Sequence, residues 1–89
     1  MENPFQEYLN IKINELNAKG EYNHLSINDK LGLIKLEILG TELFPIIKNF
    51  EKANVDPIIE KCIYIECIIN GLNPIQALDE TKKQMEDRK

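Results

Sequence analysis

The sequence predicts an all-α protein, a compact bundle of about five short helices that forms a single domain over residues 1–89. Two observations lead to this prediction. Helix-start signals recur along the chain, either as a capping residue before a proline or as a capping box. Between these signals, apolar residues repeat at helical spacing. The predicted helices cover residues 4–19, 27–39, 42–53, 57–70 and 74–87.

The first predicted helix, 4–19, begins with Asn3-Pro4, a capping residue followed by a proline at the first helical position. It ends before Gly20, a residue that commonly terminates helices. One apolar stripe runs between these signals and consists of Phe5, Leu9, Ile13 and Leu16. This stripe is predicted to face the core.

The second predicted helix, 27–39, begins with a capping box in which Ser26 accepts a hydrogen bond from the amide of Asp29. A glycine then breaks or bends the chain, and Thr41 follows as a candidate cap. We therefore expect a third helix over 42–53.

The run KCIYIECIING at residues 61–71 is ambiguous, because alternating isoleucines also favour a strand. Its flanks favour a helix, since Asp56-Pro57 and Gly71 bracket roughly 14 residues, which is long for a strand. No second strand is present to pair with it. The sequence therefore predicts a buried helix over 57–70.

The last predicted helix, 74–87, has the same start signal, with Asn73 before a proline and Gln76 at the capping-box position. Its apolar residues at helical spacing are expected to face inward, and they are Ile75, Leu78 and Met85.

Composition places the chain among ordinary globular domains, with 43% hydrophobic and 29% charged residues and a net charge of -4. The start MENPFQEY is unlike a secretory signal, and no segment has the roughly 18 apolar residues of a membrane span. We therefore expect a cytoplasmic protein that does not enter a membrane. Abundant isoleucine, asparagine and lysine, with arginine only at Arg88, suggest an AT-rich genome, such as that of a low-GC Gram-positive bacterium, its phages or its mobile elements.

No residue pattern indicates catalysis, a metal or a cofactor. Cys62 and Cys67 lie five apart, about 140° around a helix, so they cannot bridge each other there and are expected to be buried thiols. The alternative is a reactive or regulatory Cys67. His24 is the only histidine, too few for a zinc site or for a base beside Ser26, and no glycine-rich phosphate loop is present. We predict no enzyme activity.

Two predicted helices, 57–70 and 74–87, have the outline of a helix-turn-helix, and a DNA-binding regulator is the alternative function. Gln76, Lys82 and Lys83 would then contact DNA. The acidic residues of the same helix cancel its positive charge, whereas DNA affinity rests largely on neutralising phosphates. We therefore expect no specific nucleic-acid binding.

The strongest functional signal is an excess of apolar surface on 27–39 and 57–70, each of which has apolar residues on two sides. Either the two helices form the centre of the bundle, or one apolar face is exposed for a partner or for a second copy of the chain. Glu66 lies within the apolar region, where it is solvated, pairs with a lysine, or awaits a partner's cation. We predict a protein-interaction module, an adaptor, inhibitor or assembly factor that can also form a homodimer, with a binding face made of Leu33, Leu36, Leu39, Tyr64, Glu66 and Ile68.

Overall fold

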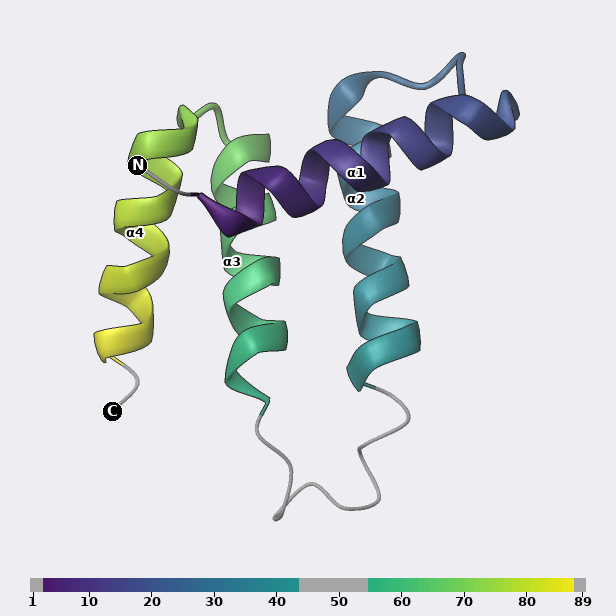
Figure 1. The fold of residues 1–89 in the computed structure, drawn as a ribbon. Coiled ribbons are helices and arrows are strands. Elements are labelled where there is room, and N and C mark those ends of the chain that lie inside the picture. The colour runs from purple at the N-terminus through teal and green to yellow at the C-terminus, as the bar shows by residue number, and fades with distance from the viewer. Residues whose placement is uncertain (1–2, 44–54, 88–89) are drawn as a thin grey trace.

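Three helices lie side by side in one layer and a fourth crosses that layer on one face (Figure 1). This computed structural model describes residues 3–43 and 55–87. The layer consists of α2, α3 and α4, and the crossing helix is α1. Their bounds are Pro4–Lys19 for α1, Ile27–Ile38 for α2, Asp56–Ile69 for α3 and Pro74–Asp87 for α4, with a π-helical turn, η1, at Leu39–Leu43.

The all-α prediction is confirmed, and no strand occurs among the described residues. Those residues hold four α-helices, so the predicted count of about five is slightly too high for this part of the chain. The helix expected over 42–53 lies outside the described residues after its first two positions, which belong to η1. Within η1 the Thr41 hydroxyl donates to the carbonyl of Glu37 at 2.7 Å, one turn back, so this turn continues the direction of α2.

Side-chain capping explains the predicted starts of α1, α2 and α4, whereas α3 begins at Asp56, one residue earlier than predicted and without a side-chain cap. The Asn3 side chain accepts from the amide of Gln6 at 3.1 Å, and Ser26 accepts from the amide of Asp29 at 3.2 Å. Asn73 and Gln76 form a full capping box, in which each side chain accepts from the other residue's amide. Gly20 and Gly71 end α1 and α3 with φ of 76° and 96°, in the left-handed region that favours glycine.

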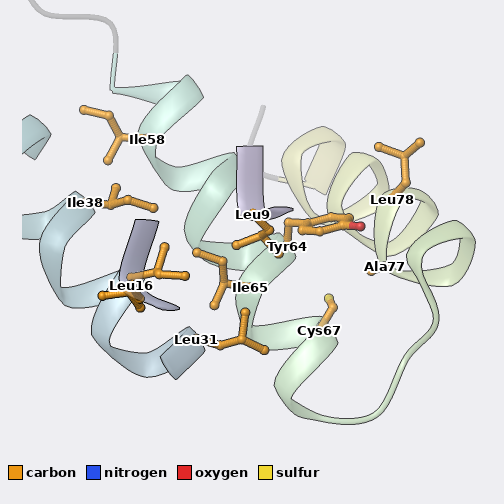
Figure 2. Close-up of a cluster of buried hydrophobic side chains, with 11 residues drawn as sticks. Leu9, Leu16, Leu31, Ile38, Ile58, Tyr64, Ile65, Cys67, Ala77 and Leu78 are labelled. Carbon is orange, nitrogen blue, oxygen red and sulfur yellow. The ribbon is translucent and has the colours of Figure 1, made fainter. Parts of the chain in front are cut away.

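The core is centred on α3, which packs between α2 and α4 (Figure 2), and α1 crosses one face of this layer (Figure 1). On one side Ile58 and Ile65 meet the apolar face of α2, and on the other side Tyr64 and Cys67 approach α4. The residues that α2 and α4 bring to this core are Leu31, Ile34, Ile38, Ala77 and Leu78. The two apolar sides of α3 are therefore both core, as the central-helix alternative expects.

Tyr64 is fully buried and connects three helices. Its ring stacks on Phe5 of α1 at 5.4 Å between centroids. Its hydroxyl donates to Gln6 Oε1 at 2.7 Å and accepts from Asn3 Nδ2 at 3.3 Å, and the same Asn3 amide donates to the carbonyl of Pro74 at the start of α4. These hydrogen bonds fix the N-terminus of α1 against α3 and α4.

Charged contacts hold the middle of α1 against α2, and η1 against α3. Lys12 of α1 pairs with Glu37 of α2 at 3.3 Å, and Lys61 of α3 pairs with Glu42 of η1 at 2.8 Å. The Lys61 ammonium also lies 4.7 Å from the centre of the Tyr8 ring, a cation–π distance. Because these side chains are partly exposed, each ion pair contributes at most about 1 kcal/mol to stability. The contacts of Lys12 with Glu37 and of Lys61 with Tyr8 link α1 to α2 and to α3.

We expect Tyr64→Phe to lower the free energy of unfolding by about 1–2 kcal/mol, because the ring still fits while two hydrogen bonds are lost. Urea denaturation followed by circular dichroism measures this. Tyr22→Phe is the matched control, since Tyr22 lies on the loop after α1 and outside this network. Equal stability of Tyr64→Phe and the wild type would contradict the structural role of the hydroxyl.

Candidate interaction surface

An apolar groove of about 290 Å³ runs along α3 between α2 and α4. Lys35 of α2 lines one side together with Leu39 and Leu43 of η1, and Gln84 of α4 lines the other. Among the described residues none of α1 lines this groove, because α1 crosses the opposite face of the layer (Figure 1). The groove is therefore the side of α3 that the described helices leave uncovered.

One helical stripe of α3 forms the floor of the groove. It follows the i, i+3, i+4, i+7 spacing of a single helix face, and its members are Ile59, Cys62, Ile63 and Glu66. The first three are half-buried and apolar, and the last is exposed. Asn70 continues the stripe by one more turn. The floor therefore has an apolar end towards the start of α3 and a polar end towards its C-terminus.

A shallow depression on α2 adjoins the groove and shares Lys35 and Leu39 with it. Gly32 lies in this depression, and a Cβ built there would have nothing within 4 Å. Leu36 stands at its edge with 65% of the side chain exposed. The remaining apolar residues around Gly32 are Leu25 and Leu33. Groove and depression together form a continuous, largely apolar surface over α2 and α3.

Glu66 pairs with Lys35 across the groove, through Oε1 of the carboxylate. The two side chains remain 49% and 29% exposed, respectively. An ion pair this exposed is screened by water and contributes at most about 1 kcal/mol. Of the predicted alternatives for Glu66, pairing with a lysine is the one found.

The structure gathers only part of the predicted binding face. Leu33 and Leu36 surround the depression, Leu39 is shared with the groove, and Glu66 lies at the polar end of its floor. Tyr64 is wrong as a binding residue, because it is fully buried against α1 and α4. Ile68 is half-buried and packs against the core rather than lining the groove.

The amino-acid sequence does not single out the stripe that begins at Ile59. Its residues recur at helical spacing, but α3 has apolar residues on so many sides that no single stripe is distinguished from the others.

The inward orientation predicted for Ile75 of α4 is wrong, since Ile75 is 66% exposed. The buried residues of α4 include Ala77 and Thr81 instead. The Thr81 hydroxyl donates a hydrogen bond to the carbonyl of Ala77 at 2.7 Å.

Both cysteines are free thiols, and both line the groove. Burial is the main cause that raises the pKa of Cys62 and of Cys67 above the ordinary value of 9.0. Since the thiolate is the reactive form, both side chains behave chemically as small hydrophobes at neutral pH. A reactive Cys67, the alternative raised by the sequence, gains no support from its surroundings.

The described residues offer no group of three or more side chains suited to bind a metal ion. None of their helices is both long and apolar enough to cross a membrane. His24 is exposed on the loop before α2. The helices of the suggested helix-turn-helix, α3 and α4, lie side by side (Figure 1), whereas the two helices of that motif cross at about 90–120°.

Comparisons with protein-family models, with curated proteins and with solved structures found no match to this chain.

We expect Gly32→Ala to raise the free energy of unfolding by about 0.5–1 kcal/mol, because alanine favours the helix and its methyl group enters open space. Thermal melting and urea denaturation measure this. Gly71→Ala serves as the contrast and is expected to lose about 1 kcal/mol or more, since its φ of 96° strains a residue with a Cβ. A destabilised Gly32→Ala protein would indicate that the space above Gly32 is filled in the folded monomer.

We expect the free energy of unfolding to fall as pH rises above about 9. Burial raises the pKa of Cys62, Cys67 and Tyr64, so the unfolded chain releases these protons first and is favoured at high pH. Below the ordinary thiol value of 9.0 this contribution is fully present. Urea denaturation between pH 7 and 10.5 tests the trend, and replacing both cysteines by alanine should reduce its slope. A slope unchanged in that variant would assign the effect to other groups.

Proposed function

We propose that this protein is a non-enzymatic protein-interaction module that binds a partner protein through the groove on α3 and the adjoining depression on α2. Adaptor, inhibitor and assembly factor are the roles that such a small domain serves without chemistry of its own. The observation that carries the proposal is the exposure of Leu36 beside the depression and next to an apolar groove. Contiguous exposed apolar surface in a small protein typically marks a site of association.

The sequence of α2 supports this proposal through Gly32. A glycine inside a helix destabilises it by about 0.5–1 kcal/mol relative to alanine, and here no described side chain occupies the space that a Cβ would take. Glycine allows another chain to approach the helix backbone closely. The open depression with leucines on its rim has the form expected of a surface that a partner covers.

A helix-turn-helix regulator that uses α3 and α4 is the alternative function, and it has less support. The exposed face of α4 offers Lys82, Lys83 and Gln76, yet α4 contains more acidic than basic residues. Such a surface lacks the net positive charge that phosphate contacts require. Binding of a protein is therefore the better-supported proposal.

A cytoplasmic location and an origin in a low-GC Gram-positive bacterium, its phages or its mobile elements belong to the same proposal. Two free thiols in one small domain are in keeping with a reducing compartment. The abundance of isoleucine, asparagine and lysine, which is typical of AT-rich genomes, supports the proposed Gram-positive, phage or mobile-element origin. A partner protein is therefore best sought in the cytoplasm of a low-GC Gram-positive host.

We expect Leu36→Asp to abolish association while the monomer stays folded, because a carboxylate at the interface would lose its water without gaining a partner. Its free energy of unfolding should change by less than about 1 kcal/mol, as for other exposed positions. Leu31→Asp is the matched control, since Leu31 is 1% exposed and its replacement should unfold the domain. Thermal melting compares the two variants, and an unfolded Leu36→Asp protein would place Leu36 in the core.

Association itself is tested with a photo-crosslinking amino acid at position 36, in a low-GC Gram-positive host, and with the same residue at position 11 on α1. Both positions are well exposed, at 65% and 58%. The proposal expects one discrete adduct from position 36, identified by mass spectrometry, and none of it from position 11. Equal adducts at both positions, or none at either, would contradict it.

A further inference from the structure

The depression on α2 is lined by one stripe of that helix and of the residues that flank it, with Leu33 beside the stripe. The i, i+3, i+4, i+7 spacing of a single helix face occurs on both sides of Gly32. The members of the stripe are Leu25, Asn28, Asp29, Gly32, Lys35, Leu36 and Leu39. Lys30 and Glu37, which contact α1, lie about 140–160° around the helix from Gly32. The stripe therefore points away from α1, on a helix at one edge of the layer (Figure 1).

The stripe is symmetric in position about Gly32. Leucines stand at its two ends, and opposite charges stand at equal distances from the glycine. In order of distance from Gly32, the matching positions are Asp29 with Lys35, Asn28 with Leu36, and Leu25 with Leu39. Two copies of α2 that meet antiparallel at Gly32 therefore bring Asp29 of each copy level with Lys35 of the other. Such an interface is isologous, with its twofold axis at the glycine.

The exposed Leu36 and the hollow beside Gly32 fit each other in this arrangement. The four stripe residues from Leu25 to Gly32 form a hole of the i, i+3, i+4, i+7 kind that receives a side chain from a facing helix. The centre of this hole and Leu36 lie in opposite directions from Gly32, each about 5–6 Å along the helix at 1.5 Å per residue. An antiparallel second copy therefore places its Leu36 in the hole. Because Gly32 has no side chain, the two backbones can approach closely there.

The charges of the depression also match a second copy. Asp29 is exposed and forms no ion pair with another described residue. Lys35 pairs with Glu66 of its own chain, but its side chain is 29% exposed and an ammonium has three donors, so it can bind a second carboxylate. Asp29 of the other copy supplies that carboxylate. Since the depression holds one acidic and one basic side chain, two copies bring no net charge together.

We propose that the partner at the depression is a second copy of this chain, and that the two α2 helices pack antiparallel across a twofold axis at Gly32. This inference rests on the proposed function and names the partner at that surface. Each Leu36 enters the hole of the other copy, and each Asp29 binds the other copy's Lys35. A single helix pair buries less surface than the roughly 1,600 Å² of a typical stable complex, so the dimer is weak.

Exchanging the two charges tests this register. Asp29→Lys and Lys35→Asp each replace two attractive contacts of the dimer by two repulsive ones, so each variant alone should dimerise at least about tenfold more weakly than the wild type. An equal mixture of the two variants should associate again, because each copy then meets opposite charges on the other. Sedimentation equilibrium of the whole protein measures this, at concentrations up to about 1 mM because the contact is small.

Matched controls use exposed charges outside the depression. Glu7→Lys and Lys19→Asp on α1 change the net charge by the same amounts and should leave dimerisation unchanged, alone or mixed. Gly32→Leu should weaken the dimer, because its side chain occupies the point where the two backbones meet, while the monomer has open space for it. Circular dichroism melts establish that each variant is folded before its association is compared.

A wild type that stays monomeric throughout, or a mixture of the two charge variants that associates no better than either alone, would overturn the antiparallel dimer. Dimerisation that Gly32→Leu leaves unchanged would overturn it as well. The crosslinking at position 36 separates these failures from failure of the proposed function. An adduct of twice the chain's mass is the result expected here, whereas an adduct with a different protein would retain the interaction module and reject only the second copy.

Discussion

The burial of α3 is the constraint on which the rest of the structure depends. This helix has apolar side chains around most of its circumference, so removing them from water requires neighbours on several sides. α2 covers Ile58 and Ile65, α4 covers Cys67, and α1 lies over Tyr64 (Figure 2). Among the described residues, α1, α2 and α4 are the helices that pack on α3, and the stripe that starts at Ile59 is the side that these helices leave uncovered.

The hydrogen bonds of Tyr64 hold the start of α1 on one side of α3. Asn3 and Gln6 bind its hydroxyl, and Asn3 also reaches the carbonyl of Pro74, so the start of α1 is held against α3 and α4. Lys12 and Glu37 hold the middle of α1 on α2. With α1 fixed across one face of the layer, the opposite face keeps both the groove and the depression. The contacts that stabilise the fold thus also expose the proposed binding surface.

Two residues of α2, Leu36 and Gly32, stabilise the monomer little, whereas both suit the proposed binding surface. A small domain gains most from burying every large apolar side chain and from avoiding glycine inside helices. Here Leu36 is exposed, so it stabilises the monomer less than a buried leucine would. Gly32 faces open space, so it stabilises the helix less than an alanine at the same position would. Association with a partner protein at the depression would account for both features, since Leu36 would become buried and the partner backbone could approach Gly32.

The sequence by itself determined the helical class and, to within one residue, the start and end of each of the four described α-helices, because capping side chains, prolines and glycines act on their nearest neighbours. It also determined that α2 and α3 have more apolar surface than one face requires. Only the tertiary structure decided which of those residues are core. Tyr64 and Leu36 both lie on a second apolar stripe, yet Tyr64 is fully buried and Leu36 is 65% exposed. The physical reason is that burial depends on which helices cross a face, and that is fixed by contacts between residues as distant as Asn3 and Pro74.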